Sequence, residues 1–452
     1  MHPLPVGRRL DWSRISTEGL SAVSAAGHLI GVSGSTLRVD GLGSTVSLGA
    51  QIELAAAATS PVQAEVIGFS ESQCLVMPYM RAPRLRLGTV ATAIVPNIVT
   101  ALAVDDTWIG RVLNPRGQPL DKKGLLGRGS NLRPIHAEPL AAISRARLGD
   151  RIDLGITALN LFATCRSGQR LGLFAGAGVG KSTLIGMLVR NVECDVVVVA
   201  LVGERGREVR EFLEDDLGVA GLARSIVVVA TADMPPILRR DAGLAAMTIA
   251  EHFRDQGRNV LFIMDSVTRY CSALREIGMS VGELPAARGY PPSVFGELPR
   301  LLERAGPGAE GIPKAGMITA MFSVLVDGDD QTEPVADALR GILDGHVVLD
   351  RRIAERGRYP AIDVLRSLSR AVPGCNSDAE NALMRRARAA LALNEETRDL
   401  VRLGAYRLGS DPDVDEALRI APQLEQILCQ DRNDRSSLPD SFRYLAHVLS
   451  GA

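Results

Sequence analysis

The sequence has few aromatic residues, no paired cysteines, no excess of charge and no long apolar run. Aromatic residues make up 4% of the 452 positions and the formal net charge is −1, so no overall basic field points to nucleic acid as a partner. The six cysteines contain no C-x-x-C pair and no histidines at zinc-ligand spacing, which favours free thiols in a reducing compartment. No apolar run reaches about 18 residues, and none follows Arg8 and Arg9, which predicts a cytoplasmic protein without a secretion signal.

A glycine-rich stretch at 168–183 reads GQRLGLFAGAGVGKST. It predicts a buried strand, a tight turn and a helix, the arrangement of a P-loop, in which backbone N–H groups and the helix N-terminus cradle phosphates. Lys181 would reach the outer phosphates and Ser182 would ligate Mg²⁺. The strict pattern has Gly where Ala175 stands. A plain turn ahead of an ordinary helix is disfavoured because Gly-Lys-Ser follows a strand. The predicted phosphate-binding residues are Gly176, Ala177, Gly178, Val179, Gly180, Lys181, Ser182 and Thr183.

Strand and helix patterns alternate around this motif. Apolar runs of strand length lie at 170–174, 195–202, 226–231, 259–265 and 317–326, and helical patterns lie at 208–217, 242–256, 267–277 and 294–304. This alternation predicts a mostly parallel α/β sheet, in which ligands bind at the carboxyl ends of the strands.

The flanking segments have other patterns. Short apolar segments with turns every eight to twelve residues predict a small β-barrel or sandwich before the core, and helical stripes predict a helical domain after it. Ser377 and Glu380 form a capping box, and Pro422 is expected to kink or split a later helix. The predicted divisions are a tail at 1–26, a β-barrel domain at 27–97, a linker at 98–137, a P-loop domain at 138–370 and a helical domain at 371–452.

Acidic and basic residues follow two of the predicted core strands. Glu204 could polarise an attacking water and Arg205 could meet phosphate charge, although spacing alone leaves a solvated charged turn equally open. Asp265 ends an apolar strand, the Walker B arrangement that holds Mg²⁺. Arg269 follows four residues later, where it could join the phosphate shell or form a surface ion pair. The acidic loop at 327–333 lacks the calcium-loop spacing and is interpreted as solvated.

Two further residues have no evident role within one chain. Tyr359 could stack on an adenine ring, and Arg370 is an isolated cation in a serine-rich turn.

The order of these segments resembles the rotary ATPase α/β superfamily, which assembles six-membered rings with nucleotide between subunits. The resemblance rests on the P-loop, on GER at 203–205, on the Walker B aspartate and on P-A-I-D-x-x-x-S-x-S at 360–369. Within the superfamily, ALVGERGREVREF, MDSVTRY, GYPPSVFGELPRLLERAG and GAYRLGSDPDVDEAL are similar to the protein export ATPases of flagella and type III secretion systems. The resemblance covers about 25–430 and implies a RecA-like core.

The resemblance implies a role for each matching residue. Glu204 matches the catalytic carboxylate, Arg205 and Arg269 match arginines near the γ-phosphate, Arg370 matches an arginine finger given to a neighbour's nucleotide, and Tyr359 matches the adenine-stacking aromatic. The family's second adenine-side aromatic would fall near LCQDRND, where this chain has none.

The implied function is Mg²⁺-dependent ATP hydrolysis by a homohexamer that energises flagellar protein export. The implied partners are a stator-like regulator at the 1–26 tail, a coiled-coil stalk, the membrane export gate, and export substrates with their chaperones, with the ATPase peripheral at the inner membrane. Four alternatives stay open: a virulence injectisome ATPase, an ATP synthase subunit, an RNA-translocating helicase and a non-catalytic nucleotide-binding scaffold. A helicase would need a basic, aromatic RNA platform that the predicted barrel lacks.

Overall fold

The computed structural model describes residues 25–55, 60–80, 85–94, 100–311, 315–326 and 333–450. Nearly all of the tail predicted at 1–26 and most of the acidic loop at 327–333 lie outside these ranges. The chain divides into two units, one ending at Ile98 and the other beginning at Val99.

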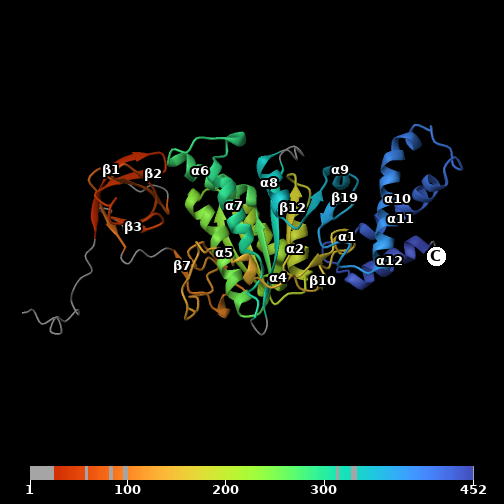
Figure 1. Cartoon of the computed structure of the whole chain (residues 1–452), viewed down its shortest axis with the longest axis horizontal. Coiled ribbons are helices and arrows are strands. Elements are labelled where there is room, and N and C mark those ends of the chain that lie inside the picture. The colour runs from red at the N-terminus through yellow and green to blue at the C-terminus, as the bar shows by residue number, and fades with distance from the viewer. Residues whose placement is uncertain are drawn as a thin grey trace, which may run out of the picture. The chain divides into compact units, whose positions relative to one another are not determined.

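The first unit is a closed six-stranded barrel, as predicted (Figure 1). Its neighbouring strands pair antiparallel in the order β1-β2-β5-β4-β3-β6, and β6 pairs with β1 to close it. Alternate residues such as Leu29, Val39 and Val66 fill the interior, so the barrel has no free sheet edge. The strands are β1 (Ala26–Ser33), β2 (Thr36–Asp40), β3 (Gln51–Leu54), β4 (Val62–Ser70), β5 (Gln73–Pro78) and β6 (Val90–Ala93).

The second unit is built on a large sheet with strand order β19-β18-β12-β17-β15-β13-β14-β8. The strands from β18 to β8 run parallel, whereas β19 is antiparallel to β18 and the short β16 is antiparallel to β17. Their bounds are β8 (Val112–Leu113), β12 (Arg170–Ala175), β13 (Val196–Glu204), β14 (Ser225–Thr231), β15 (Asn259–Asp265), β16 (Gly306–Pro307), β17 (Met317–Leu325), β18 (Gly345–Leu349) and β19 (Ile362–Ser369).

Both faces of this sheet are covered, which explains why its strands are apolar throughout. Along β13, Val197 and Val199 belong to one core cluster, while Val196 and Val198 belong to the other. Side chains of a strand alternate between the two faces, so burial of both faces requires an unbroken apolar run.

Helices cover the sheet and continue beyond its β19 edge (Figure 1). Those beside the sheet are α1 (Thr157–Phe162), α2 (Lys181–Asn191), α3 (Gly206–Glu211), the π-helical turn η4 (Phe212–Leu217), α4 (Gly218–Ala223), α5 (Pro236–Asp255), α6 (Val267–Ser280), α7 (Pro292–Arg304), α8 (Pro334–Ile342) and α9 (Arg351–Glu355). The C-terminal helices are α10 (Asp378–Arg402), α11 (Pro412–Leu428) and α12 (Leu438–Ser450). No helix in the described ranges is both long and apolar enough to cross a bilayer.

Three features differ from the sequence expectations. The segment expected to be a linker contributes β8, which extends the sheet beside β14, because the apolar pair Val112–Leu113 has an open sheet edge to join. Strands β18 and β19 are present in the structure but were not among the strands expected from the sequence. Of the kink or split expected at Pro422, the split does not occur: α11 continues through this residue, since its buried Ile420, Ala421 and Leu424 hold both halves against the core. The Ser377–Glu380 capping box at the start of α10 is confirmed.

Candidate active site

The glycine-rich turn joins β12 to α2 as the sequence predicts. Gly178 and Gly180 have φ angles of 76° and 90°, a left-handed conformation that side chains with a Cβ rarely adopt. Lys181, Ser182 and Thr183 form the first turn of α2, where backbone N–H groups have no partner within the helix and attract anions. Ala175 is the buried last residue of β12 and its φ is not positive, so alanine fits where the strict motif has glycine.

A cavity of about 460 Å³ opens beside this turn. Glu204 at the end of β13 and Asp265 at the end of β15 both line it, together with Lys181. Parallel strands bring their carboxyl ends to one edge of the sheet, and this is why residues up to 84 positions apart meet there.

Lys181 lies between the two carboxylates. Its Nζ donates a hydrogen bond to Asp265 Oδ1 and lies 3.6 Å from Glu204 Oε1. Burial opposes the charge of Lys181, but the neighbouring carboxylates of Asp265 and Glu204 prevail and raise its pKa. Ser323 Oγ donates a 2.6 Å hydrogen bond to the same Asp265 oxygen, which fixes the carboxylate in a site where its side chain is 4% exposed.

Glu204 is the most perturbed acid of the site. Burial, followed by repulsion from Asp265, raises its pKa to about 7, although Lys181 pulls in the opposite direction. Its Oε1 is buried and has no hydrogen-bond partner among the described residues. A carboxylate that lines a cavity and has a pKa near neutral is suited to accept a proton.

The two arginines predicted near the phosphates both line the cavity. The Arg205 side chain is 78% exposed and its nearest acidic partner is Glu208, at 3.9 Å. The Arg269 side chain packs against the backbone of Gly203, and within the described ranges its buried Nε finds no hydrogen-bond acceptor. Arg269 is therefore the more buried of the two arginines that line the cavity, whereas Arg205 is mostly exposed.

Tyr359 also lies beside the phosphate-binding turn. Two of its ring atoms are 3.7 Å from the position that a Cβ on Gly180 would take. The residue is 48% exposed, so one side of the ring is open to a ligand. This position supports the predicted role of Tyr359 as a stacking surface for a nucleotide base.

Arg370 lies at the amino ends of the parallel strands, whereas the P-loop lies at their carboxyl ends. It follows β19, whose last residue Ser369 pairs with Gly345 at the start of β18, and its backbone N–H donates to Asp344, which in turn donates to Arg170. Arg170 begins β12 and the P-loop follows the end of this strand, so the length of β12 separates them, roughly 17 Å at the usual rise per residue. The exposed Arg370 therefore lies far from the phosphate site of its own chain.

Comparison with known proteins identifies the family. Residues 155–369 match the model of the ATP synthase alpha/beta family, nucleotide-binding domain, and residues 376–447 match the T3SS EscN ATPase C-terminal domain. The flagellum-specific ATP synthase of Caulobacter vibrioides is 46% identical over 96% of this chain and 98% of that protein. The chain belongs to the flagellum-specific ATP synthase family. The Salmonella typhimurium relative is 43% identical over 94% of each protein.

Solved structures of type III secretion ATPases share the fold of this ATPase. The assembled ATPase EscN from the type III secretion system of enteropathogenic E. coli is 35% identical and covers 94% of this chain and 100% of its own, with a TM-score of 0.85. A second structure shows EscN in complex with its central stalk EscO, at 36% identity, over 94% of this chain and 100% of the EscN chain, with a TM-score of 0.84.

Three contacts of the ATPase site were not expected from sequence. Ser323 holds Asp265, Glu208 forms a hydrogen bond with Glu204, and Arg351 donates a 3.0 Å hydrogen bond to the carbonyl of Ala177. Ser323 had a signal, because it is a hydroxyl within the apolar run of β17, the strand between β12 and β15. The contacts of Glu208 with Glu204 and of Arg351 with Ala177 had no signal in the sequence, because only the folded chain brings these residues together.

The raised pKa of Glu204 predicts a pH dependence. The kcat/KM for ATP should rise about tenfold per pH unit up to a midpoint near pH 7 and then level off, because only the ionised carboxylate accepts a proton. Steady-state rates from pH 5.5 to 9 measure this profile. Glu208→Ala should move the midpoint to lower pH, because the hydrogen bond that protonated Glu204 donates to the Glu208 carboxylate raises the pKa of Glu204. Glu211→Ala, one turn away and paired with Arg207, should leave it in place; a profile that Glu208→Ala does not shift would contradict the assignment.

Proposed function

We propose that this chain is a Mg²⁺-dependent ATPase that works as a ring of six copies and energises the export of flagellar proteins through a type III export apparatus. The observation that carries the proposal is the meeting of Lys181, Glu204 and Asp265 in one cavity beside the phosphate-binding turn. A nucleotide carrier that does not hydrolyse ATP has no need of a basic carboxylate beside the phosphates.

Each of these residues has a separate role in hydrolysis. The turn 176–180, the first N–H groups of α2 and Lys181 bind the β- and γ-phosphates. Glu204 orients a water whose oxygen attacks the γ-phosphorus, the bond to the β–γ bridging oxygen breaks, and the proton of the water passes to the carboxylate. Arg269 stabilises the charge that develops on the phosphoryl oxygens.

The donor atoms at this site fit a magnesium ion. Mg²⁺ prefers oxygen ligands and is held in nucleotide sites by one or two protein groups together with phosphate oxygens. Ser182 and Asp265 offer a hydroxyl and a carboxylate of this kind, and Asp265 is held in place by Ser323. When bound, the ion would neutralise phosphate charge.

Two features support assembly into a ring. Arg370 lies at the amino ends of the strands, away from its own P-loop, which supports a role at a site on another copy. EscN, which shares this fold, has been solved as an assembled ATPase and in complex with its central stalk. A stalk protein is therefore a proposed partner of this chain, and the stator-like regulator at 1–26, the export gate, the chaperones and the cargo are proposed from the family alone, with action at the cytoplasmic face of the inner membrane.

The flagellar assignment is preferred to a virulence injectisome because relatives named as flagellum-specific are 43% to 46% identical to this chain. The solved structures of secretion-system ATPases are 35% to 40% identical.

Export in cells that carry this chain tests the proposal. Lys181→Ala should abolish the appearance of flagellar proteins in the culture medium and stop swimming, because Lys181 binds the outer phosphates. Lys122→Ala, a change at an exposed lysine, should leave both intact. Immunoblots of the medium measure the outcome. Normal flagellar export together with lost secretion of virulence effectors in the Lys181→Ala strain would instead assign the chain to an injectisome.

A further inference from the structure

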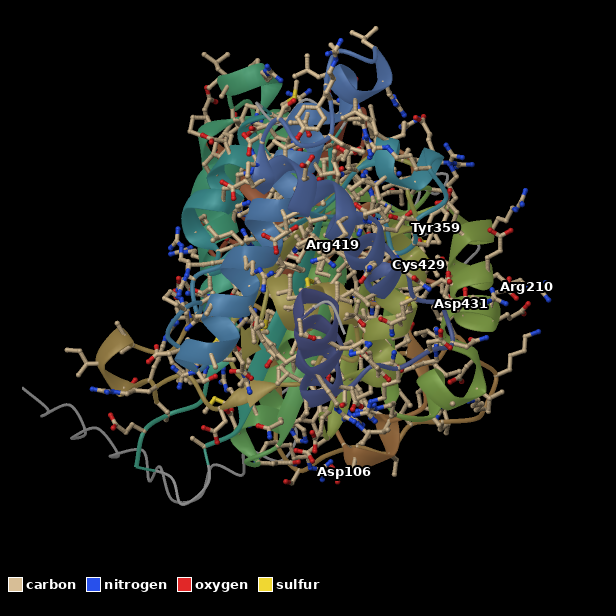
Figure 2. All side chains as sticks on the ribbon, turned by 90° about the vertical axis from the view of Figure 1, so that its right-hand side faces the viewer. Asp106, Arg210, Tyr359, Arg419, Cys429 and Asp431 are labelled. Atoms are coloured by element: carbon tan, nitrogen blue, oxygen red, sulfur yellow. The ribbon has the colours of Figure 1, made fainter. Side chains whose placement is uncertain are left out.

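The loop between α11 and α12, residues 429–437, lies against Tyr359. The backbone N–H of Gln430 donates a 2.8 Å hydrogen bond to the carbonyl of Tyr359. Figure 2 shows Tyr359 beside Cys429 and Asp431, which flank Gln430 in the chain. The loop thus reaches the stacking residue from the C-terminal side of the molecule, 71 positions along the sequence.

The side chain of Gln430 is buried and fully hydrogen-bonded. The residue is 7% exposed, and its Oε1 accepts a 3.0 Å hydrogen bond from the backbone N–H of Thr157. Its Nε2 donates to the carbonyls of Gly155 and Asp434, at 2.9 and 3.0 Å. A primary amide is needed here, since the backbone N–H and the hydroxyl of Thr157 donate to one end of the side chain while two carbonyls accept from the other.

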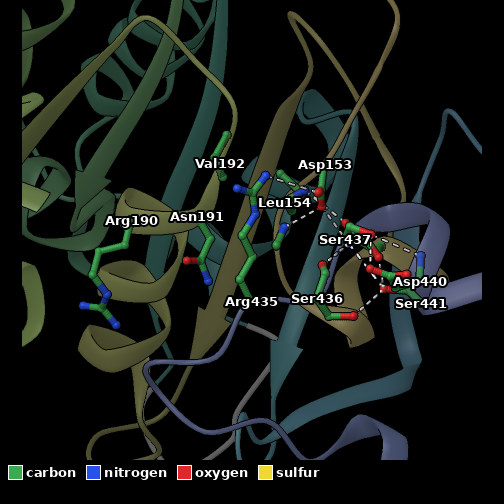
Figure 3. A network of polar contacts seen from close by, with 12 residues as sticks. Asp153, Leu154, Arg190, Asn191, Val192, Arg435, Ser436, Ser437, Asp440 and Ser441 are labelled. Atoms are coloured by element: carbon green, nitrogen blue, oxygen red, sulfur yellow. Dashed lines mark hydrogen bonds and ion pairs between the residues drawn. The ribbon is translucent and has the colours of Figure 1, made fainter. Parts of the chain in front are cut away.

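The rest of the loop is held by the same part of the nucleotide-binding core. Asn160 Nδ2 donates to Asp153 at 2.9 Å and to the carbonyl of Ser436 at 3.1 Å. Arg435 lies 3.6 Å from Asp153 (Figure 3). Asn191, the last residue of the P-loop helix α2, donates to the carbonyl of Asp434 at 3.0 Å. The loop is therefore fixed to the helix that carries the phosphate site at one point and to Tyr359 at another.

Few contacts other than this loop restrain the ring of Tyr359. Its side chain is half exposed, and the described residues offer its hydroxyl no hydrogen bond that would fix the ring from its far end. Its position beside Gly180 thus depends on the backbone to which the ring is attached. The hydrogen bond from Gln430 restrains that backbone.

We propose that Gln430 is a positioning residue for the nucleotide base: its side-chain amide locks the 429–437 loop onto the core, so that its backbone N–H holds Tyr359 beside the phosphate-binding turn. The inference rests on the proposed function, because it takes the ring of Tyr359 as the surface on which the base stacks. The side chain of Gln430 is taken up by Thr157, Gly155 and Asp434, so its proposed effect on the base passes through Tyr359.

Gln430→Met in the full chain tests the inference. Methionine matches glutamine in length but removes the amide, so three backbone groups lose their partners and the loop is freed. The KM for ATP should rise about fivefold, while kcat stays within about twofold, because base contacts far from the reacting phosphate bind ground state and transition state alike. Gln423→Met, the same change at an exposed position of α11, should alter neither constant.

A double-mutant cycle separates positioning from general loosening of the fold. Tyr359→Ala alone should raise KM about tenfold, the usual effect of losing one stacking aromatic. If Gln430 acts through Tyr359, Gln430→Met should add nothing in the Tyr359→Ala background, whereas independent effects multiply. Multiplied effects, or a fall in kcat with unchanged KM, would overturn the inference.

Gln430→Glu provides a second variant of nearly the same shape. It keeps the acceptor for Thr157 but turns a carboxylate oxygen towards two carbonyls, so KM should rise at least as much as in Gln430→Met. Loss of folding in both variants, seen by thermal unfolding, would overturn the inference, because Gln430 would then be a purely structural residue.

The proposed ATPase is tested separately: if Tyr359→Ala leaves KM unchanged while Lys181→Ala abolishes hydrolysis, the inference fails and the proposed function stands.

Discussion

Glu204→Gln is expected to lower kcat for ATP hydrolysis by about 10² to 10⁴, the usual contribution of a general base. The amide keeps the shape of the side chain but cannot accept the proton of the attacking water. ATP binding should persist and tighten slightly, since Lys181 then shares its charge with Asp265 alone. Single-turnover hydrolysis with excess enzyme measures the chemical step, and equilibrium binding of a fluorescent ATP analogue measures affinity.

Glu214→Gln is the matched control for this change. Glu214 lies in η4, pairs with Arg210 and is 60% exposed, so its variant should hydrolyse ATP at the wild-type rate. Wild-type hydrolysis by Glu204→Gln would contradict the role of Glu204 as base. Intact export by a chain that binds but never hydrolyses ATP would favour the scaffold alternative.

Arg370→Ala is expected to reduce kcat of the assembled protein by about 10³ to 10⁵, the range measured for arginine fingers. The physical reason is its position on the sheet. Arg370 follows β19 at the amino ends of β12 and β18, whereas the phosphate site lies at the carboxyl end of β12. As the proposed finger, the guanidinium would reach a transition state across an interface, and wild-type specific activity should collapse when the protein is diluted to monomers.

Mixing two inactive proteins tests this placement directly. Lys181→Ala lacks the phosphate-binding lysine but keeps Arg370, and Arg370→Ala has the opposite defect. In head-to-tail rings formed from equal amounts, about a quarter of the interfaces combine an intact Lys181 with an intact Arg370. Activity should return in the mixture in that proportion. No recovery, with mixed rings shown by mass spectrometry, would contradict a finger given in trans.

Arg366→Ala is a suitable control for the finger. Arg366 also lies on β19 and is exposed, but it pairs with Asp350 within its own chain. Its loss should leave kcat within about twofold, since removing an exposed ion pair has small effects. A loss as large as that of Arg370→Ala would show that the effect comes from damage to β19 rather than from a missing finger.

Local patterns predicted the central elements well. The strand at 259–265 is found with the predicted bounds, and α2 begins at Lys181 as the motif requires, because both depend on neighbouring residues: an apolar run closed by an acid, and glycines that permit a left-handed turn. β18 and β19 were not predicted; they pair with each other antiparallel, and β19 lies at the edge of the sheet, where its alternating buried and exposed residues do not form an unbroken apolar run. The domain limits at 137 and 370 stay predictions, whereas 98–137 contributes an edge strand rather than a pure linker.

The sequence by itself determined the phosphate-binding turn, the parallel α/β core and the identity of the acids at its strand ends, because these follow from backbone preferences and side-chain periodicity over a few residues. The tertiary structure alone decided which charges meet. Lys181 between Asp265 and Glu204, the raised pKa of Glu204, Ser323 beneath Asp265 and Gln430 behind Tyr359 all join segments far apart in the chain. Burial and Coulomb interaction depend on distance in space, so no short-range pattern carries them. The position of Arg370 is likewise decided by the tertiary structure. Because β19 runs antiparallel to β18, the residue that follows β19 lies at the amino ends of the parallel strands.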